Sequence, residues 1–334
     1  METQNELPTI PKENAFNAIR LLLCFIVLLM HALGNVEISN KYLLDGHMAV
    51  CGFFIISGFW ITKSYFSTNN LKAFFIKRIK KIFPMYYISV IGFSLVCCYF
   101  SELSIKEYFG LEYFKYLFWN CIFMNFMHPD LPGCFNGAAV NGALWTIKIE
   151  IGFYIVLPLI IFIWKKIKSN KGKNIFFLAL YVLSVLYTFI LKRYAAQWHL
   201  PSQLERQLPG FISFFVSGMF IFLNWNLFLK IKNFLIVPSV IVFVVRYFTN
   251  TEILFPAAFA IIIVWAALFF KNLKTIGNYI DFSWGLYLFH FPLMQIIFYS
   301  AGGNISVPVY IASVTGIAFL LTFILEKYVQ KKIK

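Results

Sequence analysis

Residues 17–35 read NAIRLLLCFIVLLMHALGN, an apolar stretch whose only basic or acidic side chains are Arg20 and His31. Eleven residues separate the two, which in an α-helix is three turns plus about 20°. Both side chains therefore leave one face of the helix, about 16 Å apart along its axis. A stretch of this length and composition is typical of a membrane span. Because ionisable groups are costly inside a span, the pair marks a candidate functional site.

The composition indicates a membrane protein. The chain has 334 residues, of which 60% are hydrophobic and only 13% are charged, whereas a soluble chain has about 25% charged residues. Its 41 Phe and 18 Tyr suit a lipid-facing surface with interfacial aromatic belts. We therefore predict an all-α fold, a polytopic transmembrane helical bundle.

The net charge of +15 does not indicate nucleic-acid binding. The basic residues cluster in short loops between apolar runs, where they set the orientation in the membrane. The six cysteines show no metal-ligand spacing and are expected to be small hydrophobic residues in helices. We expect no metal site and no nucleic-acid partner.

Apolar runs predict about ten spans, together with one short segment. Phe114–Met127 has only 14 residues, which is short for a crossing, so we interpret it as re-entrant or interfacial. The ten spans lie near residues 17–35, 47–66, 82–100, 143–164, 174–191, 209–226, 234–249, 254–270, 279–300 and 306–325. Pro84 is expected to start the third helix.

The loops predict the orientation. Lysine-rich loops follow the even-numbered spans, so the positive-inside rule places them and both termini in the cytoplasm. The first sixteen residues carry Glu2, Glu6 and Glu13 and do not resemble the basic region of a signal peptide. We expect a cytoplasmic tail over 1–16, a membrane domain over 17–325 and a basic cytoplasmic tail over 326–334.

Five segments in a fixed order carry a family resemblance. They are Arg20-x10-His31, GFFIISGF (52–59), KRIKKIFP (77–84), NGALWTIKIE (141–150) and FSWGLYLFHFP (282–292). Together they resemble the acyltransferase 3 family, integral-membrane enzymes that O-acylate bacterial surface glycans and related acceptors. Departures from the family pattern are Cys51 for an acidic residue, Lys81 for an arginine, Ala143 for a serine and Trp284 for a tyrosine. Lys81 keeps the charge but not the bidentate geometry of arginine.

The resemblance implies that His31 is the catalytic histidine. The chemistry agrees, because acyl transfer from a thioester to a hydroxyl needs a base whose pKa is near neutral. An acetyl-histidine relay is the variant that stays open. The alternative is a structural histidine bonded to a backbone carbonyl.

Arg20 always carries a charge, so it must face an anion, water or lipid headgroups. We expect it to bind an anionic part of the acyl donor, while the alternative is an arginine that snorkels to the interface. The distance of about 16 Å to His31 is close to the reach of the pantetheine arm of coenzyme A. Arg78 and Lys81 are candidates for binding its phosphates, with ordinary positive-inside charge as the alternative.

Glu150 lies about eight residues into an apolar span. It is a candidate catalytic residue that orients His31, binds acceptor hydroxyls or passes protons, and the resemblance does not choose among these roles. The alternative is a structural ion pair inside the bundle. Lys148, two residues before it, is expected to lie at the membrane interface.

Five further residues are candidates for substrate binding: Asn141, Trp145, Tyr287, His290 and Ser57. Trp145 is expected to offer a stacking platform for a sugar, with a place in the aromatic belt as the alternative. His290 and Tyr287 are expected to line the cavity. For Ser57-Gly58 the alternative is close packing of two helices.

The resemblance implies an acetyl-CoA-dependent O-acetyltransferase, or a transferase of another short acyl group, in the bacterial cytoplasmic (inner) membrane. Its acceptor would be a hydroxyl of an exported glycan or lipid-linked saccharide, such as O-antigen, capsule or exopolysaccharide. One competing function is a glycan or small-molecule transporter or flippase that uses the intramembrane Arg, His and Glu. Another is a membrane scaffold without catalysis. Only the transferase consumes acetyl-CoA in an acceptor-dependent way.

Overall fold

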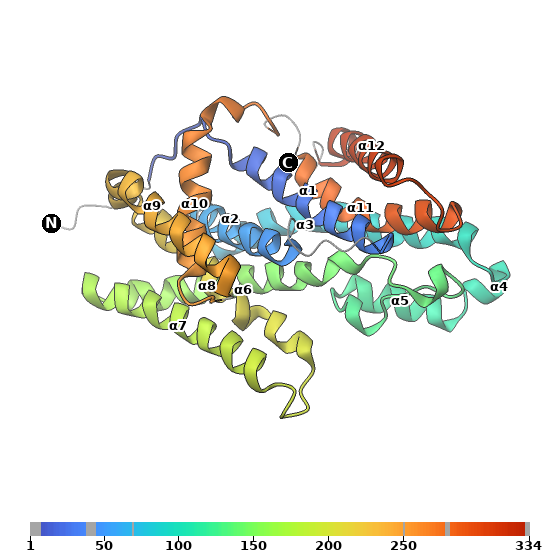
Figure 1. Ribbon diagram of the computed structural model, residues 1–334, viewed down its shortest axis with the longest axis horizontal. Helices are drawn as coiled ribbons and strands as arrows, with labels where there is room; N and C mark the ends of the chain where they lie inside the picture. The colour runs from blue at the N-terminus through green and yellow to red at the C-terminus, as the bar shows by residue number, and fades with distance from the viewer. Residues whose placement is uncertain (1–7, 38–44, 69, 250, 278–280, 331–334) are drawn as a thin grey trace. The chain divides into compact units, whose positions relative to one another are not determined.

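A computed structural model describes residues 8–37, 45–68, 70–249, 251–277 and 281–330 of the chain (Figure 1). In these residues the secondary structure is helical, with no β-strand. The helices are α1 (Phe16–Asn35), α2 (Gly46–Phe66), α3 (Leu71–Cys97), α4 (Ile105–Tyr108), α5 (Leu111–Cys121), α6 (Trp145–Lys166), α7 (Asn170–Tyr194), α8 (Leu208–Leu223), α9 (Trp225–Thr249), α10 (Phe255–Phe269), α11 (Phe282–Ser300) and α12 (Val307–Leu325). Parts of both predicted tails lie outside the described residues.

The prediction of an all-α polytopic membrane protein is confirmed. Within the described ranges, eight helices are long and apolar enough to cross a membrane, namely α1, α2, α3, α6, α7, α8, α9 and α12. The other two predicted spans correspond to α11, with 19 residues, and α10, with 15 residues. At 1.5 Å per residue α10 is about 22 Å long, shorter than the hydrocarbon core. Ten crossings therefore stay a prediction.

The short segment near residue 114 contains α5, which has 11 residues. A helix of this length covers about 16 Å and cannot cross a bilayer alone. This agrees with the interpretation of Phe114–Met127 as a segment that does not span.

The third helix begins earlier than expected. Pro84 was expected to start it, but that expectation is wrong, because α3 begins at Leu71 and Pro84 lies in its interior. A proline inside a helix removes the hydrogen bond to the carbonyl four residues earlier. That carbonyl belongs to Lys80, an exposed residue. A water molecule or a lipid headgroup can therefore donate to it in place of the backbone N–H that Pro84 lacks.

The chain divides into two compact units. Unit 1 contains Met1–Ile19, Val50–Phe75 and Ile149–Ile276, and unit 2 contains Arg20–Ala49, Ile76–Lys148 and Gly277–Lys334. The candidate residues divide between them: Ser57 and Glu150 belong to unit 1, and the other candidates belong to unit 2.

In unit 1, α2 and α8 approach so closely that two glycines are required. A Cβ on Gly58 would lie 2.0 Å from the carbonyl oxygen of Phe215, and a Cβ on Gly218 would lie 2.1 Å from that of Ile55. Phe215 also stacks on Phe153 of α6, with ring centroids 4.1 Å apart. Gly58 therefore permits helix packing, which was one of the two interpretations of the Ser57-Gly58 pair.

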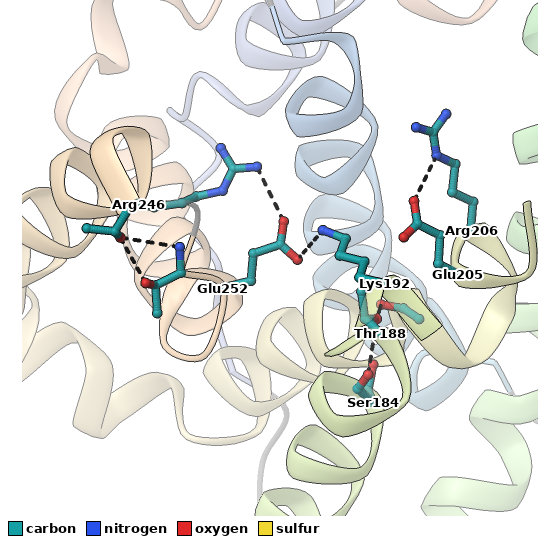
Figure 2. A network of polar contacts seen from close by, with 10 residues as sticks. Ser184, Thr188, Lys192, Glu205, Arg206, Arg246 and Glu252 are labelled. Carbon is teal, nitrogen blue, oxygen red and sulfur yellow. Dashed lines mark hydrogen bonds and ion pairs between the residues drawn. The ribbon is translucent and has the colours of Figure 1, made fainter. Parts of the chain in front are cut away.

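Charged residues around the connections from α7 to α8 and from α9 to α10 in unit 1 form ion pairs (Figure 2). Glu252 accepts from Lys192 at 2.8 Å and lies 3.7 Å from Arg246, while Arg206 lies 3.6 Å from Glu205. The Arg246 guanidinium also lies 4.1 Å from the centroid of the Phe255 ring. Arg246 thus interacts with Glu252 and Phe255 within the protein. It also lies in the last turn of α9, where a long basic side chain can extend to the membrane interface.

In unit 2, α11 packs against α12 and against the part of α1 that follows Ile19. A Cβ on Gly285 would lie 2.1 Å from the hydroxyl oxygen of Thr322, so α11 and α12 are in close contact there. Two polar contacts join α1 to the segment that contains α11: Arg20 contacts Asp281, and His31 contacts His290. The residue numbers of the partners increase together along the two segments. The two helices therefore run parallel, as the predicted topology requires of two helices that both start in the cytoplasm.

Candidate active site

The centre of the candidate site is a pair of histidines in unit 2. His31 Nδ1 lies 3.0 Å from His290 Nε2, and the two rings are nearly parallel, with an angle of 12° between their planes. The ring of Phe291 packs edge-on against the ring of His31, with their centroids 5.0 Å apart. His290 is completely buried, whereas His31 is partly exposed.

The hydrogen bonds of His290 determine which nitrogen of each ring carries a proton. His290 Nδ1 lies 3.0 Å from the carbonyl oxygen of Leu286, which can only accept, so this nitrogen is the donor. An imidazolium in this fully buried position would need a counter-ion, and no described carboxylate forms an ion pair with it. Neutral His290 then accepts at Nε2 from Nδ1–H of His31. The lone pair of His31 is left on Nε2.

Arg20 forms an ion pair at the other end of the same helix face. Its Nη1 donates to Asp281 Oδ2 at 2.9 Å, and the two side chains are 18% and 23% exposed. Asp281 also accepts at Oδ1 from the hydroxyl of Ser283. Arg20 and His31 thus contact the same neighbouring segment, 281–290, with their partners nine residues apart.

Asp281 was not among the residues selected from the sequence. Arg20 and Ser283 both donate to the Asp281 carboxyl group, an arrangement that stabilises its ionised form. The sequence indicated Asp281 only indirectly. An arginine inside a membrane helix needs an anionic partner, and Asp281 is the acidic residue directly before the FSWGLYLFHFP segment.

The positive charge of Lys81, one of the two predicted phosphate-binding residues of α3, also acts on the Asp281 carboxylate. Lys81 is exposed, whereas Arg78 on the same helix is only 8% exposed. Arg20, Lys81 and Asp281 therefore form one charged cluster, which we call the donor-end cluster. Its net charge of about +1 follows from two cations and one carboxylate at neutral pH.

Asn141 and Tyr287 have partners within unit 2. The Asn141 side chain donates to the carbonyl of Leu288 at 2.8 Å and accepts from the amide of Ala143, which caps the 3₁₀ turn η4 (Gly142–Leu144). The Tyr287 hydroxyl lies 2.6 Å from Thr146 Oγ1 and donates to the Ala143 carbonyl. These bonds fix the start of α6 against α11. For both residues they favour a positioning role, and a direct role in substrate binding stays a prediction.

Trp145 is the first residue of α6 and is half-buried. It directly follows the turn that Asn141 caps, so the same bonds fix its backbone. Lys148, one turn later, has its Nζ 4.1 Å from the centroid of the Phe126 ring. Stacking of Trp145 on a sugar is untested.

In unit 1, the structure brings together two residues that the sequence proposed separately. Glu150 Oε1 accepts from the hydroxyl of Ser57 at 3.0 Å and from the hydroxyl of Tyr154 at 3.0 Å. Tyr154, four residues after Glu150 on one helix face, was not selected, although that spacing alone makes such a bond possible. This Glu150 cluster is a polar site inside an apolar helix.

His128 lies beside Glu112, with Nε2 and Oε2 3.3 Å apart. His199 is exposed. In the described part of the chain, no three His, Cys, Asp or Glu side chains gather in a way that could hold a metal ion.

Comparison with known proteins gives the family. The sequence pattern of the acyltransferase 3 family, described as "Acyltransferase domain", matches residues 13–327. No solved structure matches the chain.

Relatives are similar over different shares of their lengths. An O-acetyl transferase of Shigella phage Sf6 is 25% identical over 300 residues, 86% of each chain. Nodulation protein 10 of Rhizobium leguminosarum bv. viciae is 26% identical over 171 residues, 46% of each chain, so the match spans about half of that protein. Peptidoglycan O-acetyltransferase OatA of Listeria monocytogenes is 24% identical over 165 residues, 46% of this chain and 26% of OatA. Because the family pattern covers nearly the whole chain, this chain belongs to the acyltransferase 3 family.

Proposed function

We propose that this chain is a membrane O-acetyltransferase that transfers the acetyl group of cytoplasmic acetyl-CoA to a hydroxyl of an exported glycan. The observation that carries the proposal is the contact between His31 and His290. It leaves an unprotonated nitrogen on a partly exposed imidazole inside a membrane helix. Family membership and two relatives named as O-acetyltransferases support the reaction type.

His31 acts as the general base. Its Nε2 takes the proton of the acceptor hydroxyl while that oxygen attacks the thioester carbonyl carbon. The new C–O bond forms, the C–S bond breaks, and the leaving thiolate of coenzyme A receives the proton from His31. In the acetyl-histidine variant the same Nε2 would be the nucleophile, so the arrangement suits either route.

The donor-end cluster binds the anionic part of acetyl-CoA. Arg20 presents five N–H donors in a planar fork, and its ion pair with Asp281 is made through Nη1. The rise of about 16 Å between Arg20 and His31 suits a donor whose phosphates lie at the cytoplasmic end and whose thioester reaches His31. This arrangement would carry an activated group made inside the cell toward a glycan that matures outside it.

The Glu150 cluster is proposed to support a substrate rather than to supply the base. Glu150 already accepts two hydroxyl hydrogen bonds at one oxygen, which is how a carboxylate is held in one orientation. A carboxylate accepts several hydrogen bonds, so this group is suited to accept from a sugar hydroxyl as well.

The test uses cells that lack the gene and carry a plasmid copy. We expect the wild type and the matched control His199→Ala to restore ester-linked acetyl groups on the surface glycan, and His31→Ala to restore none. The groups are measured by NMR before and after mild base. Restoration by a His31→Ala protein present at normal levels would remove the site assignment.

The same cells separate the competing functions. A flippase would change the amount of exported glycan, whereas a transferase changes only its acetyl content. Purified protein then shows whether acetyl-CoA is consumed when the de-O-acetylated glycan is added. A scaffold would consume none.

A further inference from the structure

Two buried cysteines from distant parts of the sequence meet at the end of α3. Cys97 is the last residue of α3, and Cys134 follows 37 residues later. The Cys134 thiol donates to the carbonyl oxygen of Cys97 at 3.3 Å, and both cysteines are free in the structure. Both residues are almost completely buried, at 0% and 1% exposure.

Other bonds hold the two segments together without help from the cysteines. The amide of Glu102 donates to the carbonyl of Gly133 at 3.0 Å, and the Ser101 hydroxyl donates to the carbonyl of Pro132 at 2.8 Å. Gly133 has a φ of +64°, and a Cβ there would lie 2.7 Å from Ser101 Oγ. The backbone therefore brings the thiols together, so closing a bond between them costs little additional ordering.

The cysteine pair lies at the end of α3 opposite to its basic end. Lys72, Lys77 and Arg78 lie in the first turns of α3, and 25 residues separate Lys72 from Cys97. In an α-helix that is about 37 Å, more than the thickness of the hydrocarbon core. If the basic end faces the cytoplasm, as the positive-inside rule predicts, the cysteine pair faces the outside. Thiols outside the cytoplasm are in an oxidising environment.

We propose that Cys97 and Cys134 are joined by a disulfide in the mature protein, and that it ties the loop leading to Asn141 and α6 to the end of α3. The proposal rests on the orientation proposed above. It goes beyond the acetyl-transfer reaction, because neither thiol takes part in that reaction.

The oxidant is the disulfide form of an extracytoplasmic thiol oxidoreductase. One cysteine thiolate attacks a sulfur of that disulfide and forms a mixed disulfide, releasing one thiolate of the oxidant. The second cysteine thiolate then attacks the bound protein sulfur and releases the other thiolate. The protein loses two electrons and two protons, and the oxidant gains both as a dithiol.

The test uses full-length protein in membranes of cells grown in air. Free thiols are blocked under denaturing conditions, disulfides are reduced, and the released thiols are labelled with maleimide-polyethylene glycol. We expect two labels on the wild type and on the control Cys98→Ala, which removes the neighbouring half-buried cysteine. Digestion without reductant should give a linked peptide pair that contains Cys97 and Cys134.

No label on the wild type, or a linked pair that lacks either cysteine, would overturn the proposal. The readout is independent of the His31 assay, so a failed disulfide leaves the proposed reaction standing and a failed reaction leaves the disulfide standing. Because the decisive samples are the wild type and Cys98→Ala, the result does not depend on the folding of a variant that lacks Cys97 or Cys134.

Discussion

At the residue scale the structure adds most at His290, which was selected as a candidate cavity residue and bonds to His31. We predict that His290→Leu lowers kcat by about 100-fold, a typical share for general base catalysis, because the acceptor that holds the His31 proton on Nδ1 is lost. The KM for acetyl-CoA should change little. His290→Gln, whose side-chain oxygen can accept near the former Nε2, should recover part of the activity. Steady-state kinetics on protein with normal thermal unfolding measure this.

An unchanged kcat in His290→Leu would show that His31 does not depend on this bond. The pH profile adds a readout that a purely structural role would not move. In His290→Leu, the limb of the kcat/KM profile that reports the ionisation of His31 should shift. In His290→Gln the same limb should shift less.

Arg20 belongs to the same scale, and its prediction concerns binding. We expect Arg20→Lys to raise the KM for acetyl-CoA about tenfold, equivalent to about 1.4 kcal/mol, with a smaller effect on kcat. Lysine keeps the charge but lacks the planar fork that can bond Asp281 and a phosphate together. Lys72→Arg, a change at an exposed position at the start of α3, serves as the control. Normal donor affinity in Arg20→Lys would count against a donor-binding role.

At the scale of elements, close helix contact depends on glycines. We predict that Gly58→Ala lowers the thermal midpoint substantially, because its Cβ would lie 2.0 Å from a backbone carbonyl oxygen of α8 and the helices must separate. Gly92→Ala on α3 is the matched control, since nothing described lies within 4 Å of its Cβ. Alanine there should be neutral or stabilising by about 0.5–1 kcal/mol. Equal midpoints for the two variants would contradict the packing.

Helix boundaries were predicted less well than helix positions. The ten apolar runs each contain an observed helix, since apolar side chains over about twenty residues favour helices in lipid whatever their neighbours. The start of α3 was missed by eleven residues, from 82 to Leu71. The KRIKK segment is too polar to be recognised as part of a span, yet lysine and isoleucine continue a helix well once it has begun.

At the scale of the whole molecule, the number of crossings is the open quantity. We predict that reporters fused to Met1 and to Lys334 both lie in the cytoplasm, which requires an even number of spans, so that α10 and α11 either both cross or both do not. Green fluorescent protein, which folds only inside, and alkaline phosphatase, which is active only outside, give opposite signals at each end. Termini on opposite sides would mean an odd number of crossings and a different loop assignment.

The division into a membrane domain over 17–325 with two tails also stays a proposal at this scale. The two compact units are made of interleaved segments rather than consecutive halves. Hydropathy along the sequence does not reveal this division, because each unit contains apolar helices from several separate parts of the chain.

The sequence by itself determined the class of protein, the approximate positions of the helices, and the shared face of Arg20 and His31. These depend on composition and on the 3.6-residue period, which are local properties of the chain. Tertiary structure decided the partners that come from other segments: Asp281 for Arg20, His290 for His31, and Ser57 for Glu150. A hydrogen bond between residues some 260 positions apart depends on how helices pack and rotate against each other, and no single helix encodes that rotation.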